Sequence, residues 1–399
     1  MSLEAIDLHD PAGYLSGPPF EAFARLRHEA PVFRQEVPGG LSYWALTRHA
    51  DVLRVSADPE TFSSQRGGIL DFEPGPDALA MLRGQLLCMD PPAHGELRRK
   101  LLPAFAPSTL QPLEARVRTI VVERLERALG ADDFDFVDLV AAEIPSQVFG
   151  ELMDCPREDR RKLRDWGAEI VKFNEPEHDA ARGHAAAIDM GSYAFRLAQE
   201  RRGGTGRDLA SLMVNATLGG EPLGEADFAA FFVQFAVAGH DTTKSLLAGG
   251  LQALAEHPAA WRELAVAPAA IPSAVEELLR FTTPLHYFRR TATRDVELHG
   301  QKIHEGEAVV MFYSSANRDE AVFDQPDRLD VARDPNPHLA FGWGEHFCLG
   351  ARLARLEARV FLEELLDRVQ RVELTGAPRR IRSNLFNGPA ELPVRLHPR

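Results

Sequence analysis

The sequence predicts a mainly α-helical protein with small β-sheets, and two kinds of pattern support that fold class. Apolar residues recur at helical spacing through most of the 399 residues. The longest such segment, Gly224–His257, is apolar nearly all round, which is typical of a helix at the centre of a molecule. Val32–Val37 and Ser42–Thr47 alternate around a turn at Pro38–Gly40, which predicts a pair of strands.

The remaining elements follow from the same periodicities, with prolines and glycines between them. Glu225 and Asp227 suit the start of the long helix, because the N-terminal end of a helix dipole is positive. Short strands and then coil are expected after Phe281, and small strands from Arg379 on. Other helices are expected at 20–28, from Pro92 onward, and at 110–129, 159–172, 180–201, 271–281 and 349–369. Residues 63–90 have no clear period and are expected to form a long loop. No long linker divides the chain, so residues 1–399 are expected to form a single domain.

The composition argues against several classes of protein. A formal net charge of -14 disfavours non-specific nucleic-acid binding, which needs a basic surface. Three cysteines without a CxxC pattern disfavour a disulfide framework or a cysteine zinc site. The N-terminus has no basic region and no apolar run, and no uncharged apolar stretch is long enough to span a bilayer. A cytoplasmic protein without membrane or nucleic-acid partners is therefore expected.

The strongest chemical signal is the glycine-rich segment Phe341–Gly350, FGWGEHFCLG, which runs into the late helix. Cys348 is expected at or just before the helix N-terminus, where the helix dipole and free N–H groups favour a thiolate. A thiolate is a soft metal ligand. Gly344 and Gly350 allow the backbone to pass close to a flat ligand. The alternative is a buried structural cysteine beside a turn.

A second polar group interrupts the long apolar helix at Ala238–Thr243, AGHDTT. Glycine and threonine favour a local opening or bend, and a charged Asp241 is costly there unless it is paired or functional. An acid beside an alcohol, Asp241 beside Thr242, can relay protons. The alternative is a kink with a satisfied polar pair. His240 is interpreted as a packed histidine without a catalytic role.

The complete pattern F-x-x-G-x-H-x-C-x-G, downstream of A-G-x-D-T, resembles the cytochrome P450 family. The resemblance implies the P450 fold, with haem b (iron protoporphyrin IX) between the long central helix and the cysteine loop with its late helix. It implies that Cys348 is the axial ligand of the haem iron and that His346 contacts a propionate. Thr242 would contact bound dioxygen, and Asp241 would control the proton supply. The other motif residues expected to border the cofactor are Phe341, Gly344, Gly350 and Ala238.

Further motifs of the same family occur in the same order. H-x-x-x-R at His94 and Arg98, and Arg290 in RRTATRD, resemble its propionate-binding positions, and arginine suits carboxylates. The E-x-x-R pair Glu277 and Arg280 would form a buried network with Arg328 of FDQPDR, which fixes the coil before Cys348. For the histidine and the arginines of the propionate motifs, the alternative is a solvated basic side chain. Trp343 is bulkier than is usual in the cysteine loop.

The implied activity is a monooxygenase that inserts one oxygen atom of O2 into a C–H bond. The chain has no flavin or iron–sulfur motif, so a separate ferredoxin-type donor is expected, and a monomer is expected. Basic residues near the cysteine loop provide a possible docking site, with a solvated helix face as the equal alternative. These residues are Arg99, Lys100, Arg352 and Arg355.

The expected substrate is a hydrophobic small molecule, because apolar residues fill the segments that border the pocket in relatives. Leu285 and Phe386 are examples. The segments RFTTPLHYFRRTATRD, SSANRDEAVFD and NPHLAFG resemble relatives that oxidise terpenoids, sterol side chains and branched fatty acids. Two alternatives stay open: a peroxide-driven hydroxylase or decarboxylase, and a non-catalytic haem or hydrophobe-binding protein.

Overall fold

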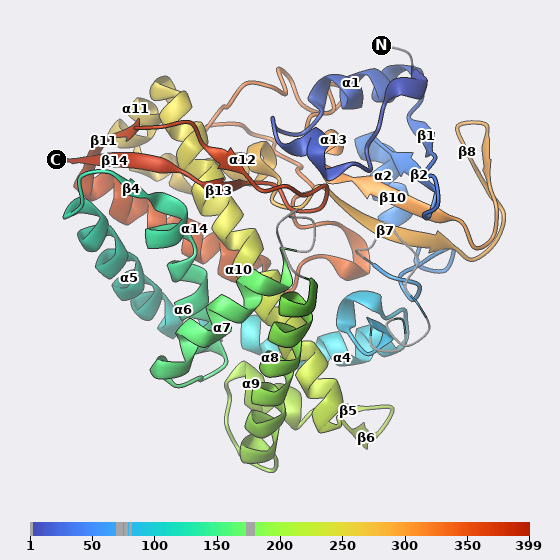
Figure 1. Ribbon diagram of the computed structural model, residues 1–399, viewed down its shortest axis with the longest axis horizontal. Coiled ribbons are helices and arrows are strands. Elements are labelled where there is room, and N and C mark those ends of the chain that lie inside the picture. Colours follow the sequence, from blue (N-terminus) through green and yellow to red (C-terminus); the bar gives the residue numbers. More distant parts are fainter. Residues whose placement is uncertain (1–2, 69–74, 76–78, 80–81, 173–179) are drawn as a thin grey trace.

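Helices make up most of the molecule, as the periodicity predicts (Figure 1). The computed structural model describes residues 3–68, 75, 79, 82–172 and 180–399. The α-helices in the described ranges are α1 Phe20–Glu29, α2 His49–Ser56, α4 Ala93–Leu101, α5 Pro107–Leu129, α6 Glu143–Leu152, α7 Arg157–Ile170, α8 Ala180–Arg201, α9 Leu209–Val214, α10 Glu225–Glu256, α11 Pro258–Val266, α12 Ile271–Thr282, α13 Tyr313–Ala316 and α14 Ala351–Arg368.

The strands are short, and the largest sheet is assembled from distant parts of the chain. Its order is β1-β2-β10-β7-β3, and the other sheets are β11-β14-β4 and the pairs β12-β13, β5-β6 and β8-β9. The strands are β1 Val32–Gln35, β2 Tyr43–Leu46, β3 Phe62–Ser63, β4 Phe134–Asp135, β5 Thr217–Leu218, β6 Glu221–Pro222, β7 Tyr287–Ala292, β8 Val296–Leu298, β9 Gln301–Ile303, β10 Ala308–Phe312, β11 Val369–Leu374, β12 Arg379–Arg380, β13 Pro389–Glu391 and β14 Pro393–Pro398. The expected pairing of the first two strands is confirmed, with Val32 opposite Leu46 in an antiparallel register.

Helix α10 crosses the middle of the molecule, and its burial explains its composition (Figure 1). It packs against α6, α7, α8, α12 and α14. Phe228, Phe231 and Phe232 are buried on it, and each such side chain stabilises the fold by about 2 kcal/mol. Asp227 accepts a hydrogen bond from the backbone N–H of Gly224 at 3.3 Å, which caps the helix start.

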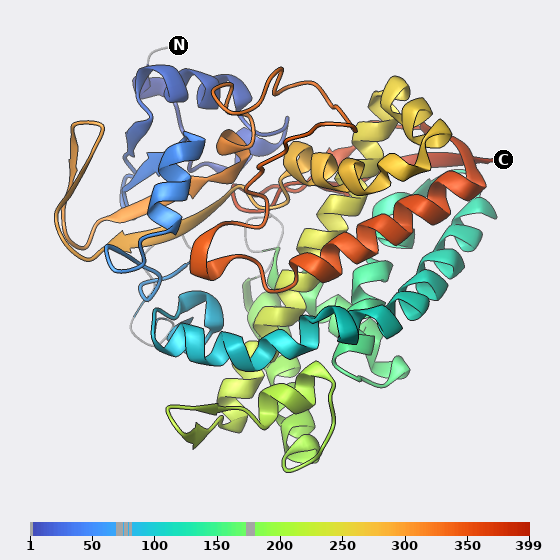
Figure 2. The ribbon, with the colours of Figure 1, turned by 180° about the vertical axis from the view of Figure 1, so that it is seen from behind.

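A long coil leads from α13 to α14 and carries the cysteine segment. In the reverse view it runs beside α10, and α4, in cyan, lies below it (Figure 2). Only the short turn Gly344–His346 interrupts the coil before α14. Sequence segments that are far apart therefore meet around one point, which is the region of the predicted site.

Two further expectations concern the small strands near the end of the chain and the loop before α4. The small strands expected from Arg379 on are confirmed as β12, β13 and β14. The loop expected over residues 63–90 falls partly outside the described residues, at 69–74, 76–78 and 80–81, and its described end contains a short turn at Leu86–Cys88. None of the helices among the described residues combines the length and apolar character that crossing a bilayer requires.

Candidate active site

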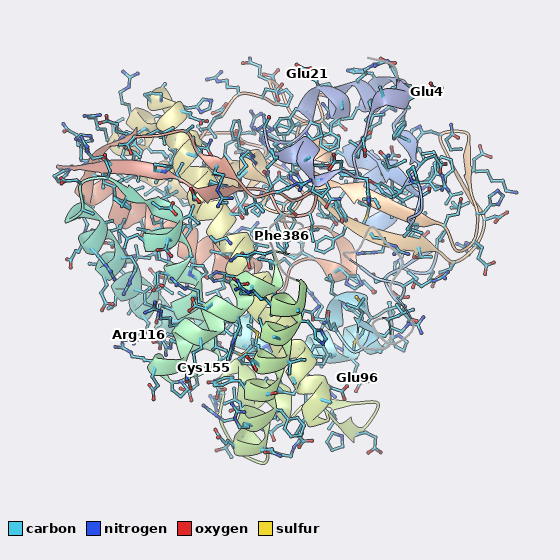
Figure 3. All side chains as sticks on the ribbon, viewed as in Figure 1. Glu4, Glu21, Glu96, Arg116, Cys155 and Phe386 are labelled. Carbon is cyan, nitrogen blue, oxygen red and sulfur yellow. The ribbon has the colours of Figure 1, made fainter. Side chains whose placement is uncertain are left out.

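A cavity of about 240 Å³ lies between α10 and the coil that carries Cys348. Ala238 and Thr242 line it from α10, and Phe341, Cys348 and Gly350 line it from the coil and the start of α14. The two motifs that the sequence singled out are therefore on different walls of one space. Leu285 also lines the cavity, whereas Phe386 is buried near the middle of the molecule, where its backbone pairs with that of Leu285 (Figure 3).

Cys348 lies just before α14, as predicted. Its side chain is partly accessible, and the space that it reaches is the cavity. Its backbone N–H donates to the carbonyl of Phe341 at 2.9 Å, which fixes the loop. Burial raises the pKa of the Cys348 thiol, whereas the N–H of Gly350 and the nearby Arg98 guanidinium lower it. The thiolate form therefore needs a further cation at the sulfur, and a coordinated metal ion supplies one.

The glycines of the loop have different surroundings. Gly350 lines the cavity, and a Cβ there would lie 3.9 Å from the Cys348 sulfur. Gly344 is exposed and does not line the cavity. Its φ of +71° is in the left-handed region, and a Cβ would lie 2.4 Å from the carbonyl oxygen of Ser56 in α2. The structure thus shows a different reason for a glycine at position 344, because the coil passes close to α2 there. Trp343 is 51% exposed and lies away from the cavity.

Four basic side chains gather at one end of the site: His94 and Arg98 of α4, Arg290 of β7 and His346 of the coil. The rings of His94 and His346 are 4.2 Å apart. Burial, Arg98 and Arg290 lower the pKa of His94 to about 4. Burial, Arg290 and His94 lower the pKa of His346 to about 2. The cluster therefore carries buried positive charge that resists further protonation.

The partners of this cluster are few. Arg98 donates to the Phe347 carbonyl at 2.5 Å, and Arg290 donates to the Arg289 carbonyl at 2.8 Å. Both ring nitrogens of His94 are buried without a partner among the described residues. His346 contacts the Ser64 hydroxyl at 3.2 Å. Within the described ranges none of the four is ion-paired with a carboxylate, so the cluster is complementary to a bound anion.

The Asp241–Thr242 pair is divided between two environments. The Thr242 hydroxyl faces the cavity and donates to the Ala238 carbonyl at 2.6 Å. Helix α10 nevertheless stays α-helical from Ala238 to Thr243, so the expected local opening is not observed. Asp241 is buried, does not line the cavity and is ion-paired with Lys244. His240 is fully buried, and burial lowers its pKa to about 4.

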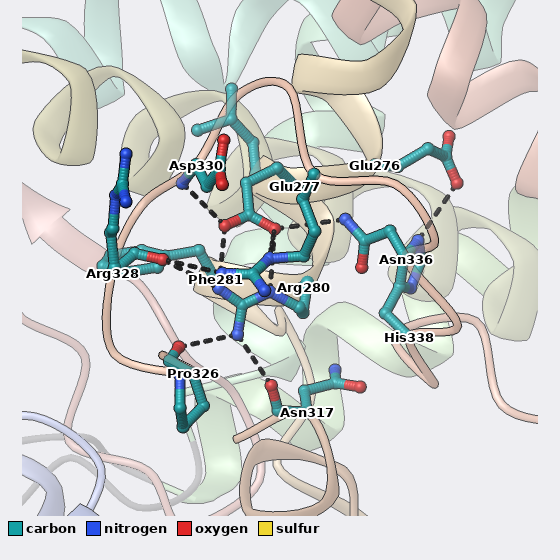
Figure 4. A network of polar contacts seen from close by, with 12 residues as sticks. Glu276, Glu277, Arg280, Phe281, Asn317, Pro326, Arg328, Asp330, Asn336 and His338 are labelled. Carbon is teal, nitrogen blue, oxygen red and sulfur yellow. Dashed lines mark hydrogen bonds and ion pairs between the residues drawn. The ribbon is translucent and has the colours of Figure 1, made fainter. Parts of the chain in front are cut away.

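A buried ion network anchors the coil before Cys348 (Figure 4). Glu277 accepts two bonds of 2.8 Å from Arg280, as the E-x-x-R motif predicts. The prediction that the Arg328 side chain completes the network is wrong. Arg328 gives only its carbonyl to Arg280, and its side chain points away (Figure 4). Arg333, five residues on, bonds Glu277 at 3.1 Å instead. The coil contains three arginines, Arg318, Arg328 and Arg333, and no sequence pattern indicates that the side chain of Arg333 is the one that bonds Glu277.

The same network reaches several parts of the coil. Arg280 donates to the carbonyls of Asn317 and Pro326, and Glu277 accepts from the Asp330 N–H and the Asn336 amide. These bonds tie the coil to α12 at positions before the cysteine loop.

A neighbouring cluster, which no sequence motif predicts, joins α12 to α14. Glu276 of α12 bonds Arg355 of α14 at 2.7 and 2.8 Å and contacts His338 at 3.0 Å. The Arg355 guanidinium lies 4.6 Å from the centre of the Phe341 ring. This cluster holds Phe341 against the start of α14.

The predicted docking residues differ in whether their side chains are ion-paired. Lys100 is paired with Glu96, and Arg355 is paired with Glu276. Arg99 and Arg352 are exposed, and neither forms an ion pair within the part of the chain that is described. Helices α4 and α14, which carry them, both border the cysteine coil (Figure 2).

Comparison with known proteins identifies the family. The cytochrome P450 family model matches residues 271–384. Linalool 8-monooxygenase of Pseudomonas putida is 34% identical, and the match covers 100% of both chains. The methyl-branched lipid omega-hydroxylase of Mycobacterium tuberculosis is 38% identical over 94% of this chain and 90% of that protein. A Mycobacterium marinum cytochrome P450 solved in complex with pseudoionone is 36% identical, with a TM-score of 0.89 over 98% of each chain.

The chain therefore belongs to the cytochrome P450 family and is a P450 monooxygenase, which implies a haem cofactor. The residues present fit that group. The described residues contain no group of three or more His, Cys, Asp or Glu that could hold a metal ion, so a metal at Cys348 needs further ligands from a prosthetic group. The basic cluster, which is not ion-paired with any carboxylate in the described ranges, suits the two carboxylates of such a group.

Proposed function

We propose that this monooxygenase binds haem b in the cavity, where Cys348 would hold the iron, and oxidises a hydrophobic molecule of the terpenoid, sterol or fatty-acid type. The observation that carries the proposal is that Cys348 and Thr242 line one cavity from different elements, beside a basic cluster that has no carboxylate partner among the described residues. We also propose that residues 1–399 act as one domain, since the helices that pack on α10 come from both halves of the chain.

In this proposal the haem, when bound, supplies the transfer of one oxygen atom from O2 to a C–H bond. Cys348 would hold the iron as a thiolate, and Phe341 and Gly350 would contact the cofactor from the coil and α14. His94, Arg98, Arg290 and His346 would hold its propionates. Ala238 of α10 would leave room for it in the cavity, because its side chain is a single methyl group.

Thr242 and Asp241 are proposed to manage protons in the same site. The Thr242 hydroxyl can donate into the cavity once it turns from the Ala238 carbonyl, where it lies at 2.6 Å. Asp241 lies next to it in sequence and has one oxygen, Oδ2, without a partner in the described part of the chain. This acid is therefore assigned the delivery of protons to Thr242, and its ion pair with Lys244 holds its side chain in place.

The apolar lining supports a hydrophobic substrate. Phe105, Phe149 and Leu285 face the cavity, and burial of a ligand's apolar surface contributes about 25 cal/mol per Å². The similar proteins bear names that refer to linalool, a steroid and a methyl-branched lipid. A separate acidic ferredoxin is the proposed electron donor, because the exposed Arg99 and Arg352 can attract it.

The test is a titration of the ferric holoprotein with terpenes, sterols and fatty acids, read as a change of the haem from low to high spin. We expect a saturable shift with one class, and product from that compound when a ferredoxin, its reductase and NAD(P)H are supplied. Turnover with peroxide and none with ferredoxin would contradict the proposal in favour of a peroxide-driven enzyme. A protein that takes up no haem would contradict it entirely.

A further inference from the structure

The wall that α10 presents to the cavity contains one polar amide that the proposed reaction does not use. Gln234, Ala238 and Thr242 line the cavity at four-residue spacing, so they share one face of the helix. Ala238 and Phe235 are apolar, and Thr242 has its role in the proton supply. Gln234 is left as a polar group on this face without an assigned task.

The amide of Gln234 is incompletely satisfied. Its Oε1 is buried and has no hydrogen-bond partner among the described residues. A buried amide oxygen without a partner costs about 1–3 kcal/mol, and the side chain lines a cavity that a ligand can enter. An amide also offers both a donor and an acceptor, so it can pair with a hydroxyl or a carbonyl.

The charges around the cavity exclude an anionic partner for Gln234. Among the described lining residues, the basic side chains are Arg98, His94 and His346, which belong to the cluster assigned to the propionates. The remaining charged lining residue is Glu357, an acid. A carboxylate beside Gln234 would thus be buried without a cation, which is strongly unfavourable.

We propose that Gln234 selects the substrate by a hydrogen bond to a neutral polar group, a hydroxyl or a carbonyl, on an otherwise hydrophobic molecule. The inference rests on the proposed function and narrows its substrate class to alcohols, ketones and aldehydes, at the expense of hydrocarbons and free fatty acids. Eight residues separate Gln234 from Thr242, about 12 Å along the helix axis. The polar group therefore binds at one end of the molecule, and oxidation occurs at a carbon on the other end.

The test uses two carbon skeletons, an acyclic ten-carbon terpenoid and a four-ring steroid. Each is offered as alcohol, carbonyl compound, hydrocarbon and carboxylic acid, and the dissociation constant is measured from the spin-state shift of the ferric holoprotein. The variants are Gln234→Leu, which keeps the size and removes the amide, and Gln252→Leu as a control. Gln252 is on the same helix but bonds Glu256 outside the cavity.

For the skeleton that fits, we expect the alcohol or carbonyl compound to bind at least tenfold more tightly than the hydrocarbon and the acid. Gln234→Leu should remove this preference, whereas Gln252→Leu should keep it. Equal binding of hydrocarbon and alcohol by the wild-type protein, or an unchanged preference in Gln234→Leu, would overturn the inference and leave the proposed function standing. No shift with any of these compounds would overturn the inference, and the proposed function would fall with it only if the fatty acids of the first titration also gave no shift.

Discussion

The two walls of the cavity are built on different principles. On the side of the cysteine coil, the buried acid Glu277 has a full set of partners, because Arg280, Arg333, Asn336 and a backbone N–H all bond it. On the α10 side, buried oxygens of three side chains lack partners within the described residues. They are Gln234 Oε1, Asp241 Oδ2 and Ser245 Oγ. The first wall is thus held by a network that is complete as protein alone, whereas the second wall carries Gln234, which lines the cavity and can pair with a molecule that enters it.

The largest effect is expected from breaking the first wall. Glu277→Ala leaves Arg280 and Arg333 buried without their carboxylate, so the free energy of unfolding should fall by about 3–5 kcal/mol, with loss of haem. The control is Glu391→Ala, because the Glu391 side chain is 52% exposed and its pair with the exposed Arg379 should be worth about 1 kcal/mol or less. Urea unfolding of both variants measures the difference. Equal decreases in the free energy of unfolding would contradict the prediction, because they would show that the buried network stabilises the fold no more than the control ion pair does.

A change to the second wall should affect catalysis and leave stability almost intact. Thr242→Ala removes the hydroxyl in the cavity, and product formation with the ferredoxin system should fall about 100-fold. Thr242→Ser keeps the hydroxyl and should retain most of the activity. The haem spectrum and the unfolding midpoint should match those of the wild type. A Thr242→Ala enzyme of undiminished rate would remove Thr242 from the proton path.

Glu357 of α14 is an exception on the first wall, because it is a buried acid without the partners that Glu277 has. Its raised pKa predicts how the free energy of unfolding depends on pH. Glu357 is buried, its Oε2 has no partner in the described chain, and burial raises its pKa from 4.5 to about 8. Between these values the folded protein keeps a proton that the unfolded chain releases. The free energy of unfolding should therefore fall as pH rises from about 5 to 8, by at most about 1.4 kcal/mol per pH unit. Chemical unfolding of Glu357→Gln should lack this component, and parallel pH curves for the two proteins would refute it.

The smallest effect is expected from charge reversal on the protein surface near the cysteine coil, and it concerns the rate of reduction. The double change Arg99→Glu and Arg352→Glu should slow reduction by a ferredoxin about tenfold at low salt, and the difference should shrink as ionic strength rises. The exposed Arg262 and Arg371, on α11 and β11, give a control pair with the same change in net charge. Stopped-flow reduction measures the rates. Equal slowing in both pairs would mean that net charge matters and this surface does not.

The contrast between the walls also explains how much the sequence could predict. Cys348, His346 and Glu277 belong to the fixed wall, where each residue type is set by its chemistry and short motifs mark it. The sequence could not predict that the side chain of Arg333, and not that of Arg328, bonds Glu277, because this depends on the path of the coil beside α12. Gln234 and Glu357 fall within ordinary helical patterns, and only the packing of α10 and α14 around the cavity distinguishes them from other polar positions.

The assignment of Cys348 as the iron ligand is tested most directly by the absorption spectrum of the ferric protein and its three cysteine variants. Cys88 and Cys155 are buried and do not line the cavity, so Cys88→Ala and Cys155→Ala serve as controls. The expected result is a thiolate-type haem spectrum in the wild type and both controls, and its loss in Cys348→Ala alone. A thiolate spectrum that survives in Cys348→Ala would contradict the account.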